Sequence, residues 1–200
     1  HHTRHLVVDT GLVAKDLNWG AAISFLQNCQ NLPEFNKGTN VAGDAANLGG
    51  FHYYPGYSQA GNVTNSHTGR VSLRSYGSAS YAGLLSYVYA DLKHDDPRVQ
   101  SVVAWLGSNY TLEENPGMGQ QGLFYYYQLI TRAMIAAKMD KLPGKDGTLI
   151  DWRRDISLRV VNLQKSDGSW ANENNRWWES DPVLVTSYSL IALEMIYPDL

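Results

Sequence analysis

The segment at residues 163–188 constrains the fold of this chain most, because it connects two helices of opposite character. Over residues 152–163, apolar side chains recur at spacings of three and four, which predicts an amphipathic helix. Asp181 and Pro182 then mark a new helix start, since the carboxylate can accept first-turn amide protons and proline lacks one. Asp96 and Pro97 repeat this signal earlier in the chain, and we interpret Asp96 as a helix cap as well. That second helix has Glu194 as its only charge, so we expect it to be buried on most sides.

The loop between these helices carries Gln164, Gly168 and Trp170, and this spacing resembles the QW motif of the squalene-cyclase and prenyltransferase family. In that family the motif ends the outer helix of a helical hairpin and ties it to the start of a neighbouring helix. The resemblance implies an all-α fold, a partial α/α toroid, in which Trp170 lies buried near Gln164. A generic helical repeat is the alternative.

The order of outer helix, loop and inner helix recurs along the chain. We predict three hairpins, with long loops at one end, from residues 16–27 and 78–91, 97–110 and 120–137, and 152–163 and 182–196. Gln27 would belong to a degenerate first copy of the motif, and residues 4–11 look like the tail of an earlier helix. The long segment at residues 31–76 is rich in aromatics, so we expect a packed loop with a short hairpin.

A ring of this family closes with about six hairpins, whereas this chain accounts for three and a piece. The resemblance therefore implies that residues 1–200 form one domain, the C-terminal half of a longer toroid. We expect an exposed apolar seam along the first helices, met by the missing N-terminal half or by another chain.

Composition excludes several classes of partner. The net charge of −3 and the scattered Lys and Arg residues argue against nucleic acid, and no apolar run is long enough to predict a membrane span. Cys29 is the single cysteine, which leaves no cysteine cluster for structural zinc, so we expect neither a metal nor another cofactor. The sequence does not determine the compartment.

The candidate site follows from topology, because the starts of the three inner helices should lie at one end together with the long loops. Binding candidates there are aromatic or basic: Arg74, Tyr76, Tyr126, Arg176, Trp177 and Trp178. The weak candidates for a catalytic acid are Glu113, Glu114 and Asp181. Asp181 is better explained as a helix cap and the two tryptophans as loop packing. The positive helix ends would also favour anions.

Three classes of function remain open, and the sequence does not decide whether the chain is an enzyme. An isoprenoid enzyme of this family would need the D-x-D-D acid or a zinc set, and both are absent, so we expect this chain alone neither to cyclise squalene nor to transfer a prenyl group. The second class is a non-catalytic toroid that binds a hydrophobic small molecule or a protein. The third is a carbohydrate-active toroid that uses paired carboxylates such as Glu113, Glu114, Glu179 or Asp181.

Overall fold

The computed structural model describes residues 18–199, and this part of the chain is mostly helical, as predicted. The helix expected at residues 4–11 lies outside the described residues. The α-helices are α2 (Trp19–Asn28), α3 (Gly77–Tyr89), α4 (Pro97–Ser108), α5 (Leu123–Ala136), α6 (Trp152–Asn162) and α7 (Pro182–Ile196). The short strands are β1 (Asn62–Thr64), β2 (Val71–Leu73), β3 (Leu142–Pro143) and β4 (Leu149–Ile150), which pair as two antiparallel hairpins.

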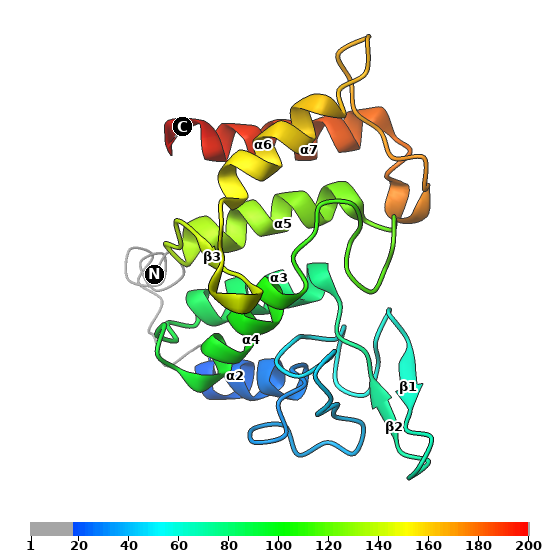
Figure 1. Cartoon of the computed structure of the whole chain (residues 1–200), viewed down its shortest axis with the longest axis vertical. Coiled ribbons are helices and arrows are strands. Elements are labelled where there is room, and N and C mark those ends of the chain that lie inside the picture. Colours follow the sequence, from blue (N-terminus) through cyan, green and yellow to red (C-terminus); the bar gives the residue numbers. More distant parts are fainter. Residues whose placement is uncertain (1–17, 200) are drawn as a thin grey trace.

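The helices form a stack with α2 at one end and α7 at the other (Figure 1). The most extensive contacts join α3 to α5 and α5 to α7, so these three helices form a continuous inner row. Helices α2 and α4 pack against α3, and α6 packs against α7. The loops that precede α3, α5 and α7 all lie on the same side of the stack, where these helices begin.

The core is one continuous cluster with side chains from α3, α4, α5, α6 and α7, and in its middle α3 and α5 carry large apolar side chains on the faces that meet. Tyr81 and Leu84 of α3 and Tyr126, Ile130 and Met134 of α5 are fully buried. The rings of Tyr81 and Tyr126 meet edge to face with their centroids 5.7 Å apart, a preferred geometry for aromatic pairs. Burial of these side chains fixes the spacing of the inner row.

Two helix starts coincide with the predicted Asp-Pro signals. Asp96 precedes α4 and its carboxylate accepts from the backbone N–H of Arg98 at 2.9 Å. Asp181 precedes α7 and accepts from the backbone N–H of Val183 at 2.8 Å. The capping interpretation of both aspartates is therefore confirmed, since each side chain satisfies an amide that the helix leaves without a partner.

The long segment at residues 31–76 is a packed loop that includes the β1–β2 hairpin, as predicted. Its central side chain is Asn31, which is fully buried. The Asn31 amide donates to the Leu73 carbonyl at 2.9 Å, and its oxygen accepts from the backbone N–H of Ala42 at 2.9 Å. One buried asparagine therefore joins three parts of the loop.

Trp170 joins the two helices of the last hairpin. It is 3% exposed; its indole N–H donates to the Val160 carbonyl of α6 at 2.7 Å, and its backbone N–H donates to the Thr186 hydroxyl of α7 at 3.1 Å. Gln164 is exposed and donates to the Gly168 carbonyl at 2.9 Å, so it closes its own turn and does not reach a neighbouring helix.

The glutamine that ties two hairpins together is Gln30, three residues after the predicted Gln27. Gln30 is fully buried, and its amide donates to the carbonyls of Gly49 and Arg98, each at 2.9 Å. Its oxygen accepts from the Tyr87 hydroxyl at 2.9 Å. These bonds connect the end of α2 with α3 and with the first turn of α4.

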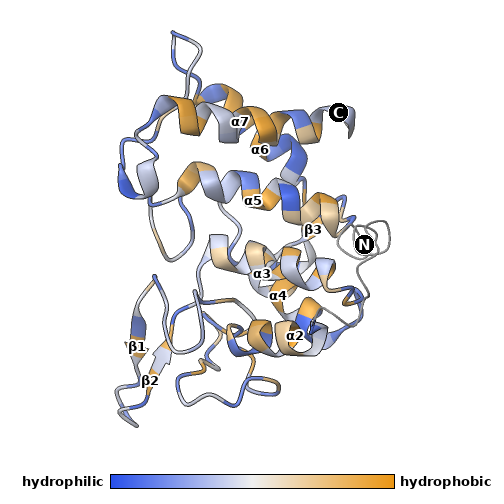
Figure 2. Cartoon of the chain, turned by 180° about the vertical axis from the view of Figure 1, so that it is seen from behind, coloured by the Kyte–Doolittle hydropathy of each residue, from blue (hydrophilic) through white to orange (hydrophobic). Residues whose placement is uncertain are grey.

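The expectation that α7 is buried on most sides is wrong. Val183, Leu190 and Ile191 are 75%, 53% and 39% exposed. Apolar residues colour much of this edge helix in Figure 2. Helix α7 ends the stack, so none of the described residues covers its outer face. At the other edge α2 has no fully buried residue, and Phe25 is 53% exposed.

None of the helices in residues 18–199 combines the length and the hydropathy that crossing a bilayer requires.

Candidate ligand-binding pocket

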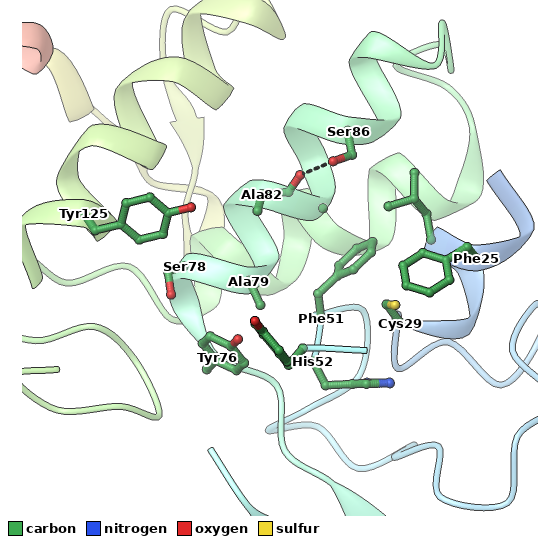
Figure 3. A pocket seen from close by; sticks show the side chains of 13 residues that line it. Phe25, Cys29, Phe51, His52, Tyr76, Ser78, Ala79, Ala82, Ser86 and Tyr125 are labelled. Carbon is green, nitrogen blue, oxygen red and sulfur yellow. Dashed lines mark hydrogen bonds between the residues drawn. The ribbon is translucent and has the colours of Figure 1, made fainter. Parts of the chain in front are cut away.

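A cavity of about 230 Å³ lies between α2 and α3, with the loop at residues 51–53 as one wall and the start of α5 as another (Figure 3). We call it the aromatic pocket. Its lining side chains are mainly aromatic or small: Phe25, Leu26, Cys29, Phe51, His52, Tyr53, Tyr76, Ser78, Ala79, Ala82, Gly83, Ser86 and Tyr125.

Small residues of α3 form the floor of the aromatic pocket. Ala79, Ala82, Gly83 and Ser86 follow one another at helical spacing and therefore share one face. Gly83 is required there, because a Cβ atom would lie 2.6 Å from the ring of Phe51. The Ser86 hydroxyl donates to the Ala82 carbonyl of its own helix at 2.8 Å, so this proton does not need an acceptor on a ligand.

The wall at residues 51–53 is held by backbone bonds to the two neighbouring helices. The backbone N–H of His52 donates to the Cys29 carbonyl at 2.9 Å, and the Phe51 carbonyl accepts from the N–H of Tyr76 at 3.1 Å. The N–H of Phe51 donates to the Ser80 hydroxyl of α3 at 2.9 Å. The wall is thus fixed to the end of α2 and to the first turn of α3.

A second cavity of about 240 Å³ adjoins the first at the starts of α3 and α5, and we call it the mouth pocket. Four residues line both cavities: Tyr53, Tyr76, Ser78 and Tyr125. Tyr53 and Tyr125 are 56% and 41% exposed, so both rings stand where the pockets open to solvent. The mouth pocket is completed by Gln59, Asn115, Met118, Gln121, Gly122 and Trp177.

Both cavities are electrically neutral. Within residues 18–199, no Asp, Glu, Lys or Arg side chain lines either of them. Cys29 does not change this, because burial raises the pKa of its thiol to about 11 and keeps the sulfur protonated. Burial also lowers the pKa of His52 to about 4, although the nearby Asn28 carbonyl opposes the shift, so the imidazole is uncharged at neutral pH.

The starts of the inner helices already have acceptors, contrary to the expectation that they favour anions. The N–H groups of Gly77 and Ser78 donate to the Pro116 carbonyl at 2.8 Å and to the Asn115 side-chain oxygen at 2.9 Å. At α5, the N–H of Tyr125 donates to the Glu179 carboxylate at 2.8 Å. These amides are therefore not free to bind a ligand anion.

Glu179 is a buried carboxylate with a structural task. It is 1% exposed, and its second oxygen accepts from the Asn172 amide at 2.8 Å. Burial raises its pKa, and the bonds from Asn172 and from the first turn of α5 oppose that rise. Gly122, which precedes α5, has no side chain to cap the helix, so Glu179 supplies the cap from a distant loop.

The structure brings only part of the predicted binding set together. Tyr76 and Trp177 line the mouth pocket. Tyr126 instead lies in the core at 1% exposure, and its hydroxyl donates to the Thr111 carbonyl at 3.1 Å. Trp178 is 80% exposed and lines neither cavity. The two tryptophans share a left-handed backbone, with φ of 63° at Trp177 and 66° at Trp178.

The predicted arginines also lie outside the pockets. Arg74 is exposed and donates to the Asn62 carbonyl at 3.2 Å across the β1–β2 hairpin. The guanidinium of Arg176 lies 4.5 Å from the ring centre of Trp177, a cation–π contact at the rim.

The candidate acids are spread over the surface and the helix ends. Glu113 is exposed and pairs with Arg159 at 2.8 Å, Glu114 is exposed, and Asp181 caps α7. With Glu179 committed to α5, three of the four carboxylates considered for glycoside chemistry have structural partners. The geometry therefore favours neither an acid at the pockets nor a carboxylate pair across them.

Sequence reasoning missed the small-residue floor and His52. The spacing of Ala79, Ala82 and Ser86 is visible in the sequence, but the large residues of α3 drew attention to its opposite face. His52 had no such signal, because its place depends on a loop that only the folded chain defines.

Comparison of the chain with protein-family models, curated proteins and solved structures found no match.

Proposed function

We propose that this chain binds a neutral, hydrophobic small molecule in the aromatic pocket. The observation that supports this proposal is the lining of the pocket. Aromatic rings surround a floor of small residues, and no charged side chain of the described residues lines the pocket. Ligand sites of this kind are typically apolar and aromatic, with a few polar groups that fix orientation. A charged ligand would lose its hydration there without gaining a counter-ion.

We further propose that the inner row of α3, α5 and α7 is an arc of a squalene-cyclase-like toroid. The support is the QW-like loop, in which Trp170 joins α6 to α7, and the alternation of inner and outer helices. On this proposal the ligand is isoprenoid-like. The described pocket residues include no carboxylic acid that could protonate an alkene, so the proposed role of this chain alone is binding and not cyclisation.

The same proposal implies a partner at the edges of the arc. Val183, Leu190 and Ile191 expose an apolar face on α7, and Phe25 is half-exposed on α2. Apolar surface of this kind is commonly covered by another protein surface. We propose that an N-terminal half or another chain meets these edges.

Titration of the protein with farnesene or squalene, followed by calorimetry, tests the binding proposal. Ala82→Leu adds three carbon atoms to the floor of the pocket. If these displace about three methylene groups of ligand, affinity falls by roughly 2 kcal/mol, or about thirtyfold. The matched control is Ala104→Leu, because Ala104 is exposed on α4 and lines neither pocket.

Unchanged affinity in Ala82→Leu would place the ligand elsewhere on the chain. Equal losses in Ala82→Leu and Ala104→Leu would indicate general damage to the fold. Absence of binding to the unaltered protein would contradict the proposed function itself.

A further inference from the structure

Every residue that lines both the aromatic pocket and the mouth pocket carries a hydroxyl group: Tyr53, Tyr76, Ser78 and Tyr125. We call these four residues the hydroxyl junction. None of their hydroxyl protons has an acceptor within residues 18–199, and the Ser78 oxygen only accepts, from the Asn115 amide at 3.1 Å. The place where the two cavities meet is therefore lined by hydrogen-bond donors whose acceptors do not come from the described part of the protein.

Tyr76 is the tyrosine of the hydroxyl junction that the protein buries most. It is 6% exposed, yet its hydroxyl oxygen keeps accessible surface at the cavities, whereas the partnerless hydroxyl of Tyr81 is sealed in the core. Burial raises the pKa of Tyr76, and the neighbouring Tyr53 and Tyr125 raise it further, so the phenol keeps its proton at neutral pH. Tyr76 is thus a buried donor that faces the cavities and lacks an acceptor.

The aromatic pocket has a polar end and an apolar end. Figure 3 shows Tyr76 and Ser78 at the start of α3, with the ring of Tyr125 extending toward them from α5. Phe25 and Phe51 lie on the opposite side of the pocket in the same view. A ligand that fits both ends therefore combines a hydrocarbon part with one polar group.

We propose that the ligand of the aromatic pocket carries a neutral oxygen acceptor, as in an alcohol, an ether or a ketone, and that the Tyr76 hydroxyl donates a hydrogen bond to it. This inference rests on the proposed function and specifies the chemical class of the ligand. The hydrocarbon part lies on the floor of α3, and the oxygen lies at the hydroxyl junction. A carboxylate or diphosphate would need cationic donors, and no described Lys or Arg lines either cavity.

The other polar groups of the pocket are less suited to this task. Both ring nitrogens of His52 are sealed from the cavity, and the Ser86 hydroxyl donates within α3. The Cys29 thiol is only a weak donor. Tyr53 and Tyr125 are 56% and 41% exposed, so bulk water reaches these two residues without a ligand. The buried hydroxyl of Tyr76 gains most from a ligand acceptor.

The test uses three ligands with a farnesyl-type hydrocarbon chain. Farnesene has no oxygen, farnesyl methyl ether only accepts hydrogen bonds, and farnesol both accepts and donates. Calorimetry gives the affinity of each oxygen-bearing ligand relative to that of farnesene. Tyr76→Phe removes the donor and keeps the ring. Both relative affinities should fall about fivefold, the size of one neutral hydrogen bond, while the affinity for farnesene stays unchanged.

Tyr81→Phe is the matched control, because it removes a buried hydroxyl from the same helix at a residue that lines neither cavity. It should leave both relative affinities unchanged. Neither variant should lower Tm in thermal melts, since neither hydroxyl has a partner in the described protein. A lower Tm in Tyr76→Phe alone would show that the protein itself uses this hydroxyl, which would overturn the inference.

The remaining outcomes separate this inference from the proposed function. If farnesene binds and Tyr76→Phe leaves both relative affinities unchanged, the inference is wrong and the proposed function stands. A fall for farnesol but not for the ether would also overturn the inference, because the ligand would then be the donor. Tighter binding of farnesoic acid than of farnesol at neutral pH would overturn it as well. If none of these ligands binds, the inference and the proposed function fail together.

Discussion

Glu179 should be among the most important polar side chains for stability, because it caps α5 from a distant loop. Its carboxylate accepts from the backbone N–H of Tyr125 and from the Asn172 amide, each at 2.8 Å. The side chain is 1% exposed, so water does not replace these partners readily. Glu179→Ala removes both bonds and leaves the start of α5 without an acceptor at Tyr125.

The expected loss can be worked from these contacts. A hydrogen bond to a charged group contributes about 1.5–3 kcal/mol, and the second bond contributes about 1 kcal/mol. The Asn172 amide keeps its bond to the Gln120 carbonyl at 2.7 Å, which limits the damage on that side. Removal of a buried charge, whose pKa burial already raises, returns some free energy. The net loss should be roughly 2–4 kcal/mol, or about 4–16 °C in Tm for a chain of this size.

Urea unfolding followed by circular dichroism measures this change. Glu179→Gln should lose about half as much, because its carbonyl can still accept from Tyr125 while its NH₂ group faces the Asn172 amide. Glu194→Ala is the matched control, since Glu194 is an exposed glutamate on α7, and it should change the free energy of unfolding by less than about 0.5 kcal/mol. If Glu179→Ala behaves like Glu194→Ala, the capping argument is wrong.

Three further predictions concern His52, Gly107 and Trp178. His52 is protonated below about pH 6.5 in the unfolded chain, but only near pH 4 in the folded chain. The free energy of unfolding should therefore fall by roughly 2 kcal/mol between pH 7 and pH 5. In urea titrations at these two pH values, His52→Leu should lack this part of the pH dependence. Gly107→Ala should cost about 2–3 kcal/mol in thermal melts, since its Cβ atom would lie 1.8 Å from the Pro143 carbonyl oxygen, whereas Gly20→Ala, with its nearest atom at 3.7 Å, should be neutral or stabilising. Trp178→Gly should raise the free energy of unfolding by about 0.5–1 kcal/mol, because glycine adopts the left-handed backbone of this exposed residue without strain; a loss of stability would show that Trp178 packs against something.

The helices were predictable because their signals are local. Asp96 and Asp181 mark helix starts through side chains that reach amides two residues away, and the stripe at residues 152–163 records which face of α6 is buried. Burial of α7 was not predictable in the same way. The apolar composition of α7 shows that the helix could be buried on most sides, whereas its actual exposure depends on which neighbour lies beside it.

The site was harder to predict than the helices, since it depends on contacts between segments far apart in sequence. Tyr76 and Tyr126 looked alike in the sequence, yet one lines the pockets and the other faces the core. Glu179 was grouped with possible acids because a sequence cannot show that residue 125 supplies its hydrogen-bond partner. His52 could be placed in the lining of the pocket only once the fold of the loop at residues 51–53 was known.

The most direct test of the central claim is to locate a bound ligand by photo-crosslinking with a diazirine analogue of farnesol, followed by mass spectrometry of the labelled peptides. The aromatic pocket predicts crosslinks in residues 25–29, 51–53 and 76–86 and at Tyr125, and their loss in Ala82→Leu. The exposed face of α7 is the competing apolar surface on this chain. Crosslinks concentrated in residues 183–191, and unchanged by Ala82→Leu, would contradict the assignment of the pocket as the ligand site.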